Sequence, residues 1–223
     1  YHILKTIIFL RKTLNSLKPY SVLSFGETYN SFVLLSALGL KQRIFVSDRS
    51  RPDKGWGTFH ETLRRILYPK ASGIISQTNY SLEFLGKITG HKNIKVIPNP
   101  VNTTMIVENV RKNVVLYIGR LVSTKRIDLL LEVFSKSKYK EWVLWIIGDG
   151  PERNFLEEQS RNLGVENSVR FWGSQKNIGD FYQQSKIFAL TSVSEGFPNA
   201  LLEAMSYGLG CISFDCLSGP SDL

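Results

Sequence analysis

The chain has 223 residues, 43% of them hydrophobic, which is enough for one large domain or two small ones. No apolar run approaches the length of a membrane span, and no signal peptide is recognisable. The formal net charge of +9 is concentrated in residues 1–107, which hold 15 Lys and Arg against 5 Asp and Glu, whereas residues 108–223 hold 13 and 14.

Residues 1–101 alternate between helical and strand-like patterns, which is typical of a parallel sheet with helical crossovers. The expected helices cover 3–17, 29–38, 59–67 and 80–88, and the expected strands cover 21–25, 43–47, 72–76 and 94–97. The first helix carries an apolar stripe that we expect to pack on a core rather than on a membrane. Its members are Leu4, Ile7, Ile8, Leu14 and Leu17, with Arg11 on the same face.

Two prolines in Pro98-Asn99-Pro100 exclude a central strand and end this series. Residues 102–112 show no strong period, and we interpret them as a linker. A second series then begins. Its expected strands cover 113–118, 142–147, 168–172, 187–190 and 211–214, and its expected helices cover 125–135, 151–164, 177–184 and 198–207. We therefore expect an α/β protein with two domains, 1–101 and 113–223.

The stretch from Ser194 to Glu203 joins the strand at 187–190 to a helix start, with Gly196 in the turn. A helix start at the carboxyl end of a strand favours an anion, typically a phosphate, because free N–H groups and the helix dipole point at it. Glu195 and Glu203 both face that position, since helical side chains lean toward the N-terminus. Phosphate alone repels two carboxylates, so we expect a ligand that also offers hydroxyls, as a sugar nucleotide does.

A second signal is Gly119-Arg120 followed by Lys125, because it places two cations after the strand at 113–118. A diphosphate suits this pair, since Arg can grip two oxygens and Lys acts as a point charge. Either motif alone is compatible with ordinary solvated charges, but together, at one edge of one sheet, they favour a binding site. Arg126 is the neighbouring cation that could take the place of Lys125.

The stretch from Ser194 to Glu203, with its continuation Ala204-Met205-Ser206-Tyr207-Gly208, resembles the signature of the retaining GT-B glycosyltransferases of family four (glycosyl transferases group one). The likeness covers nearly the whole chain. Residues 114–222 resemble most of the C-terminal, donor-binding domain, and residues 1–101 resemble the latter half of the N-terminal, acceptor-side domain. The resemblance implies a GT-B fold of two Rossmann-like parallel-sheet domains facing a cleft, and we expect both to be incomplete in this chain.

By this resemblance, Arg120 and Lys125 hold the donor diphosphate beside Gly119, and Glu203 accepts hydrogen bonds from the ribose hydroxyls. Glu195 lies against the donor sugar, and with the two cations it forms the implied catalytic group. Near the sugar and phosphate lie Gly196, Phe197, Pro198 and Asn199, and near the base lie Gly173 and Ser174.

The implied reaction moves a sugar from a nucleoside-diphosphate sugar to an acceptor hydroxyl with retention, in cell-surface polysaccharide or glycolipid assembly. It requires no metal and no cofactor, so the cations stabilise the leaving diphosphate. Asp48 is expected to face the cleft, with Arg49 as a contact for an acceptor phosphate, whereas His60 and His91 are expected to be structural or solvated. The uneven charge agrees with a lipid-linked or saccharide acceptor and with a cytoplasmic protein, peripheral at the inner face of an anionic membrane, although plain solubility explains it equally well.

Two other functions stay open. A truncated, non-catalytic module would keep the fold and bind a nucleotide sugar or a partner without turnover. Nucleic-acid binding through the basic half lacks interleaved aromatic residues and any nucleic-acid motif, so we expect no such partner. The two cysteines, Cys211 and Cys216, lack the spacing of a metal site, and we expect buried or free thiols in a reducing compartment.

Overall fold

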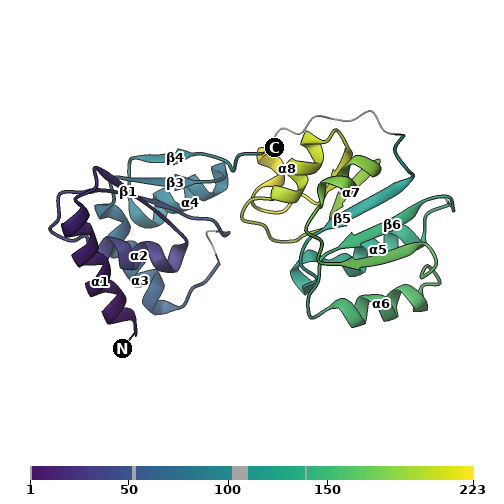
Figure 1. Ribbon diagram of the computed structural model, residues 1–223, viewed down its shortest axis with the longest axis horizontal. Coiled ribbons are helices and arrows are strands. Elements are labelled where there is room, and N and C mark those ends of the chain that lie inside the picture. The colour runs from purple at the N-terminus through teal and green to yellow at the C-terminus, as the bar shows by residue number, and fades with distance from the viewer. Residues whose placement is uncertain (1, 52–53, 102–109, 139) are drawn as a thin grey trace. The chain divides into compact units, whose positions relative to one another are not determined.

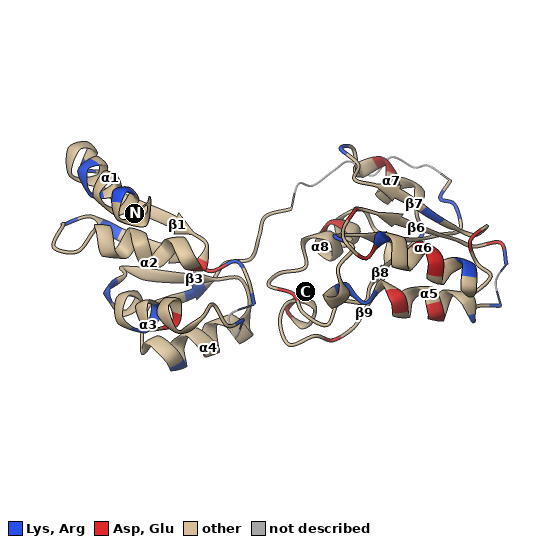
Figure 2. Cartoon of the chain, turned by 90° about the horizontal axis from the view of Figure 1, so that it is seen from below, with Lys and Arg blue, Asp and Glu red and all other residues tan. Residues whose placement is uncertain are grey.

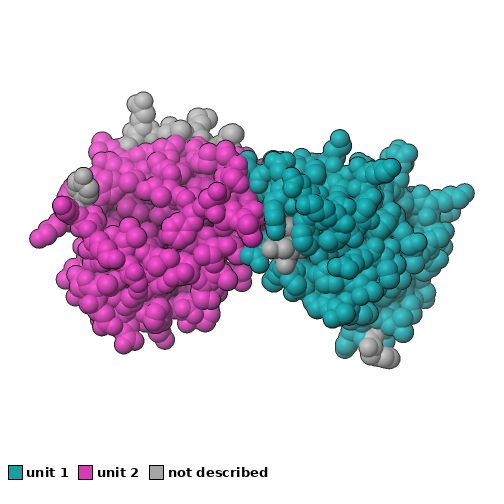
Figure 3. Space-filling view, turned by 180° about the vertical axis from the view of Figure 1, so that it is seen from behind, with its two compact units in different colours: residues 1–99, 222 teal, residues 100–221, 223 magenta. Residues whose placement is uncertain are grey.

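The chain forms two compact units, and the computed structural model describes residues 2–51, 54–101, 110–138 and 140–223 (Figure 1). The first unit contains residues 1–99 and 222, and the second contains residues 100–221 and 223 (Figure 3). Most of the predicted linker, 102–112, lies outside the described residues. No helix in the described part of the chain is both long and apolar enough to cross a membrane.

The first unit is a four-stranded parallel sheet in the order β1-β2-β3-β4, so strands that follow one another in the chain are neighbours. Its strands are β1 (Ser21–Phe25), β2 (Arg43–Ser47), β3 (Gly73–Ser76) and β4 (Ile94–Val96). Its helices are α1 (His2–Leu17), α2 (Glu27–Ser36), α3 (Thr58–Leu67) and α4 (Asn79–Thr89), with the 3-10 turn η1 (Tyr68–Lys70). The core between sheet and helices contains Val46, Ile74 and Leu85, all buried.

The apolar stripe predicted for α1 is wrong over most of its length. Leu14 is the only described residue of α1 that is buried, whereas Leu4 and Leu17 are 62% and 72% exposed. The helix packs mainly on α2. The Arg11 guanidinium adds hydrogen bonds to this contact, because it donates to Ser36 O and Leu38 O at the C-terminal end of α2. A helix with one main packing partner buries a narrow strip, and that strip here runs through Leu14.

The second unit is a five-stranded parallel sheet in the order β7-β6-β5-β8-β9. Its strands are β5 (Val114–Ile118), β6 (Val143–Ile147), β7 (Val169–Gly173), β8 (Ile187–Leu190) and β9 (Gly210–Ser213). Its helices are α5 (Ile127–Ser135), α6 (Arg153–Asn162), α7 (Gly179–Gln184) and α8 (Asn199–Ser206), and the 3-10 turns are η2 (Ser123–Lys125) and η3 (Pro220–Asp222). Both cysteines of this unit are free, with Cys211 exposed and Cys216 buried.

The helices and strands predicted from the sequence agree with those observed to within two residues.

The central strand β5 has its successors β6 and β7 on one side and β8 and β9 on the other. Right-handed crossovers in opposite directions place helices on opposite faces of a sheet. Accordingly, α5 and α6 pack on one face around Leu131 and Ile146, and α7 and α8 pack on the other around Leu116 and Phe188. The strand order reverses between β5 and β8, and ligands of open α/β sheets bind outside the carboxyl ends of the strands at such a switch point.

Candidate functional site

The turn after β5 is fixed by close backbone packing against the turn after β6. The Gly119 N–H donates to Ile147 O at 3.0 Å. Gly148 has a φ of +130°, and a Cβ built on it would lie 1.9 Å from Gly119 O. Gly148 is therefore required both by its backbone conformation and by the approach of the neighbouring turn. This packing sets the position of the residues that follow Gly119.

The turn η2 is tied to the segment that follows β8. Thr191 Oγ1 donates to Lys125 O at 2.9 Å, and the Val193 N–H donates to Thr124 O at 3.0 Å. These two bonds join the segment after β5 to the segment after β8. The two stretches that the sequence singled out therefore meet at the switch point of the sheet.

Lys125 and Glu195 form an ion pair across these two segments. The Lys125 Nζ lies 2.5 Å from Glu195 Oε1, and the two side chains are 18% and 11% exposed. Partial burial reduces the screening of their attraction by solvent, and each side chain restricts the position of the other. The Arg120 guanidinium is exposed and has no ion pair among the residues that the structure describes. Arg120 is thus the cation that can still meet an incoming anion.

A cavity of about 210 Å³ lies where these segments meet the start of α8. Seven of its lining residues belong to the predicted site, namely Gly119, Arg120, Lys125, Glu195, Phe197, Pro198 and Asn199. No side chain caps α8, whose N-cap is Pro198. The N–H groups of Asn199 and Leu201 donate to Phe197 O and Pro198 O at 3.0 Å, whereas the Ala200 N–H, at the lining of the cavity, has no hydrogen bond within the residues that the structure describes and is open to a ligand. Positive charge and an uncapped helix start at one cavity suit an anion.

Tyr117 forms part of the floor of the cavity. Its hydroxyl donates to Arg120 O at 3.3 Å, and the side chain is fully buried. Burial raises the pKa of Tyr117 well above its ordinary value, the charge of Glu195 raises it further, and Arg120 opposes the shift. The phenol therefore stays protonated and supports the carbonyl of Arg120.

Glu203 lies one helical turn beyond Asn199 and does not line the cavity. Residues four apart share one face of a helix, so Glu203 stands next to the cavity rather than in it. Its Oε2 accepts a hydrogen bond of 3.0 Å from the Tyr182 hydroxyl. Of the four charged residues predicted to converge, the structure places Arg120, Lys125 and Glu195 around one cavity and Glu203 one helical turn away.

Three other predicted positions also lie outside the cavity lining. Gly196 is adjacent in sequence, and its carbonyl accepts from Ser218 Oγ at 3.2 Å. Gly173 ends β7, where its φ is +66° and its carbonyl accepts from the Gly148 N–H, and Ser174 follows it as an exposed residue. Because β6 separates β7 from β5, Gly173 and Ser174 stand two strands away from the cavity.

Asp48 is buried within the first unit rather than exposed, in contrast to the expectation. It is 2% exposed, and its Oδ1 accepts from the Tyr68 hydroxyl at 2.7 Å and from Asn30 Nδ2 at 3.0 Å. Burial raises the pKa of Asp48 to about 6, helped by the nearby charge of Glu27, whereas the Tyr68 bond and Arg64 lower it. The carboxyl turns inward because these polar partners lie in the core.

Arg49 is exposed beside this buried network, with its guanidinium 4.7 Å from the centre of the Phe25 ring. The two histidines have structural surroundings, as expected. His91 bonds to Ala71 O at 3.0 Å, and His60 packs edge-on against two phenylalanine rings.

Arg126 does not take the place of Lys125. Its guanidinium pairs with Asp128 at 2.9 Å, and its backbone φ of +48° turns the chain into α5. Among the described residues, no group of three or more His, Cys, Asp and Glu is arranged to hold a metal ion.

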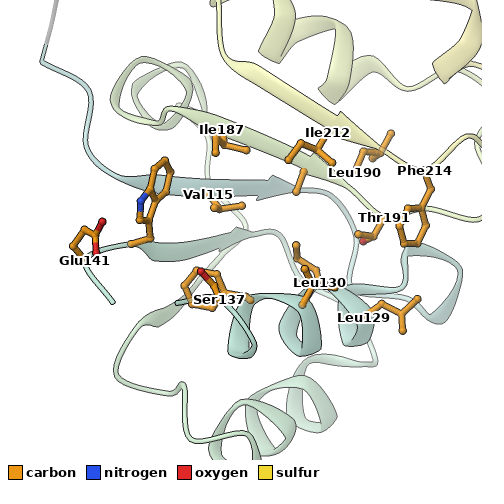
Figure 4. A pocket seen from close by; sticks show the side chains of 14 residues that line it. Val115, Leu129, Leu130, Ser137, Glu141, Ile187, Leu190, Thr191, Ile212 and Phe214 are labelled. Carbon is orange, nitrogen blue, oxygen red and sulfur yellow. The ribbon is translucent and has the colours of Figure 1, made fainter. Parts of the chain in front are cut away.

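A larger hollow of about 450 Å³ lies elsewhere in the second unit, between α5 and the strands β8 and β9 (Figure 4). Its walls are mostly apolar, as the labelled side chains of Leu130, Ile187, Ile212 and Phe214 show. Glu141 is the only charged residue among those that line it in the described part of the chain. Such a surface does not suit a diphosphate, so size alone does not identify the site.

Comparison with known proteins decides the family. The sequence model of the family described as Glycosyl transferases group 1 matches residues 104–223. The chain belongs to this family. It is 29% identical over 214 residues to the amylovoran biosynthesis glycosyltransferase AmsD of Erwinia amylovora, covering 91% of this chain and 60% of that protein. It is 40% identical over 142 residues to the lipopolysaccharide 1,6-galactosyltransferase of Salmonella typhimurium, covering 59% of this chain and 39% of that protein.

Solved structures agree with this family and show that the fold of this group 1 member is GT-B. The apo form of the lipopolysaccharide outer core galactosyltransferase WaaB superposes with a TM-score of 0.79 at 28% identity, covering 99% of this chain and 63% of that one. The Anabaena protein Alr3699/HepE in complex with UDP superposes with a TM-score of 0.84 at 17% identity, covering 96% of this chain and 64% of that one. This group 1 chain thus spans about 40 to 60% of the length of the two curated relatives.

Proposed function

We propose that the protein transfers a sugar from a nucleoside-diphosphate sugar to an acceptor hydroxyl with retention of configuration. The observation that carries this proposal is the cavity at the switch point, where Arg120, Lys125 and Glu195 meet the uncapped start of α8. The names of the relatives support it, because AmsD is called an amylovoran biosynthesis glycosyltransferase and the Salmonella protein a lipopolysaccharide 1,6-galactosyltransferase.

The proposed chemistry depends on the groups that bind the diphosphate. Arg120 and the Ala200 N–H at the start of α8 bind the diphosphate and stabilise the negative charge that grows on it as the bond to the anomeric carbon breaks. Lys125 adds a second cation, which its pairing with Glu195 holds in place. The acceptor oxygen bonds to the anomeric carbon on the same face, and its proton passes to the leaving diphosphate. No protein base is then required, and we propose that no metal or other cofactor is needed.

The acceptor is proposed to be a saccharide or a lipid-linked saccharide, and the setting to be polysaccharide or glycolipid assembly in the cytoplasm at the inner face of the membrane. The basic first unit supports an anionic partner there. Figure 2 shows Lys and Arg on several of its helices, whereas acidic residues lie on α5 and α6 in the second unit. Nucleic acid is not proposed as a partner.

Calorimetric titration tests the donor half of this proposal. UDP, GDP and ADP, and then the sugar conjugates of the best binder, are titrated into the full-length protein, with the matching nucleoside as control. We expect at least one diphosphate to bind more tightly than its nucleoside, because the cavity recognises the phosphates. If none of the diphosphates binds at millimolar concentration, the proposal is wrong. NMR of the glycoside formed from an α-linked donor then decides between retention and inversion.

A further inference from the structure

Glu203 is held by a buried phenol from another helix. Tyr182 lies on α7 and is 1% exposed. Its hydroxyl is 3.0 Å from Glu203 Oε2 and 3.1 Å from Ala200 O, so its one proton is shared between a carboxylate and a helix carbonyl. Nothing in the sequence pattern paired these residues, because they are 21 positions apart and on different helices.

The position of the phenol is rigid. The Tyr182 ring stacks on Tyr207 at 5.1 Å between centroids with 19° between planes, and the centroid of the Phe188 ring lies 6.2 Å from it. Burial raises the pKa of Tyr182 far above its ordinary value, and the charge of Glu203 adds to the shift. The hydroxyl therefore remains a donor, held by aromatic packing in the core of the second unit.

One oxygen of Glu203 stays available. Tyr182 occupies Oε2, and no hydrogen bond to Oε1 occurs within the residues that the structure describes. Glu203 follows Asn199 by four positions, so it lies about 6 Å along the same helix face from the lining of the cavity. A carboxylate oxygen there is placed to accept from a hydroxyl next to a bound diphosphate, which in a nucleotide belongs to the ribose.

We propose that Tyr182 is a positioning residue for nucleotide recognition: it binds one oxygen of Glu203 so that the other accepts a ribose hydroxyl of the donor. This inference rests on the proposed function, since it assumes that a nucleoside diphosphate occupies the cavity. It assigns the preference for ribonucleotides to a pair of side chains, one that touches the ligand and one that does not.

The test compares UDP with 2′,3′-dideoxy-UDP, or the same pair for whichever base binds best. Wild-type protein is expected to bind the ribonucleotide about tenfold more tightly, because a hydrogen bond to a charged group is lost in the dideoxy compound. In Tyr182→Phe the preference is expected to fall to about twofold to threefold, with little change for the dideoxy compound. Tyr68→Phe is the matched control, because it removes another buried phenol that donates to a carboxylate, in the core of the first unit.

Glu203→Gln provides a second test that keeps the phenol in place. Its amide oxygen can still accept from Tyr182, while an NH₂ group replaces the free carboxylate oxygen. The ribose preference is expected to fall to about twofold to threefold, because the charge-assisted bond is lost and only a neutral bond from the NH₂ to a ribose hydroxyl oxygen can replace it. A Tyr182→Phe protein that retains the full tenfold preference overturns the inference, and so does a Glu203→Gln protein that retains it. Failure of wild-type protein to bind any nucleoside diphosphate instead contradicts the proposed function, so the two outcomes are distinct.

Discussion

At the scale of single residues, the cavity holds two cations that are not equivalent. Lys125 is already paired with Glu195, whereas Arg120 is exposed without an ion pair in the described structure. We expect Arg120→Ala to weaken UDP binding about 10- to 100-fold, because charge-assisted and bidentate hydrogen bonds are lost. Uridine binding should stay the same, since the nucleoside lacks the diphosphate. Titration calorimetry of both ligands measures this difference.

Arg126→Ala is the matched control for that experiment. It removes a guanidinium six residues away that is committed to Asp128. UDP affinity is expected to remain within about twofold of wild type, because solvent-exposed charges contribute little at ordinary salt. An equal loss in both variants would show that general positive charge, rather than the geometry of the cavity, binds the diphosphate.

The buried carboxyl of Asp48 makes the stability of the first unit dependent on pH. Its pKa rises from 3.8 to about 6 on folding, so the folded state holds the proton more strongly than the unfolded state. The resulting stabilisation is fully present below pH 3.8 and is lost as the pH rises to about 6. Its size is on the order of 3 kcal/mol, from the free energy of one pKa unit. Urea unfolding of wild type and Asp48→Asn at pH 4 and pH 7 measures it.

The difference in unfolding free energy between wild type and Asp48→Asn separates the effect of Asp48 from that of the other carboxyl groups, which titrate in the same pH range in both proteins. Asn cannot ionise, so Asp48→Asn should gain stability relative to wild type on going from pH 4 to pH 7. Asp215→Asn, at an exposed carboxyl in the second unit, serves as the control. Parallel pH profiles for wild type and Asp48→Asn would contradict the assignment.

At the scale of elements, the turn after β5 depends on the glycine that packs against it. We expect Gly148→Ala to lower the free energy of unfolding by about 3 kcal/mol or more, because the added Cβ meets Gly119 O and the φ of +130° is strained for alanine. Gly164→Ala, at a φ of +67° in open space, should cost only about 1 kcal/mol. Denaturant titrations followed by tryptophan fluorescence compare the two variants, and equal losses would mean that close packing at Gly148 contributes nothing.

The sequence was sufficient for most elements because parallel sheets bury their strands as short apolar runs and mark each turn with glycine or proline. It was insufficient where burial depends on the neighbours of an element. The stripe on α1 is mostly exposed because the helix packs mainly on α2. Asp48 follows a strand, as many site residues do, but Tyr68 and Asn30 draw its carboxyl inward.

The candidate site divides in the same way. The sequence predicts that Arg120, Lys125 and Glu195 lie together, because each follows a strand of the same parallel sheet and the carboxyl ends of such strands share one edge. The bond from Tyr182 to Glu203 depends on how α7 and α8 pack, and no motif records that contact. A lone tyrosine in a short helix gives no sign of a site, and Tyr182 is both a core residue and the hydrogen-bond partner of a predicted site residue.

At the scale of the whole molecule, the two halves of the chain differ in charge, and α1 adds exposed apolar side chains. Leu4, Ile8 and Phe9 are 62%, 48% and 67% exposed on this helix, and Lys12 is exposed as well. Apolar and basic residues together on one helix surface favour adsorption to an anionic membrane. We expect the protein to co-sediment with vesicles rich in phosphatidylglycerol and to stay in the supernatant with phosphatidylcholine vesicles.

This adsorption should weaken at high salt, because the Debye length falls from about 10 Å at 0.1 M to about 3 Å at 1 M. Lys12→Glu is expected to reduce binding about tenfold or more, since each basic residue near an anionic surface is worth about 1 kcal/mol and the reversal removes one charge and adds its opposite. Lys176→Glu reverses an exposed charge in the second unit and should leave binding nearly unchanged. If both reversals weaken binding equally, net charge alone drives the adsorption; if neither does, the basic residues of the first unit serve solubility rather than a membrane contact.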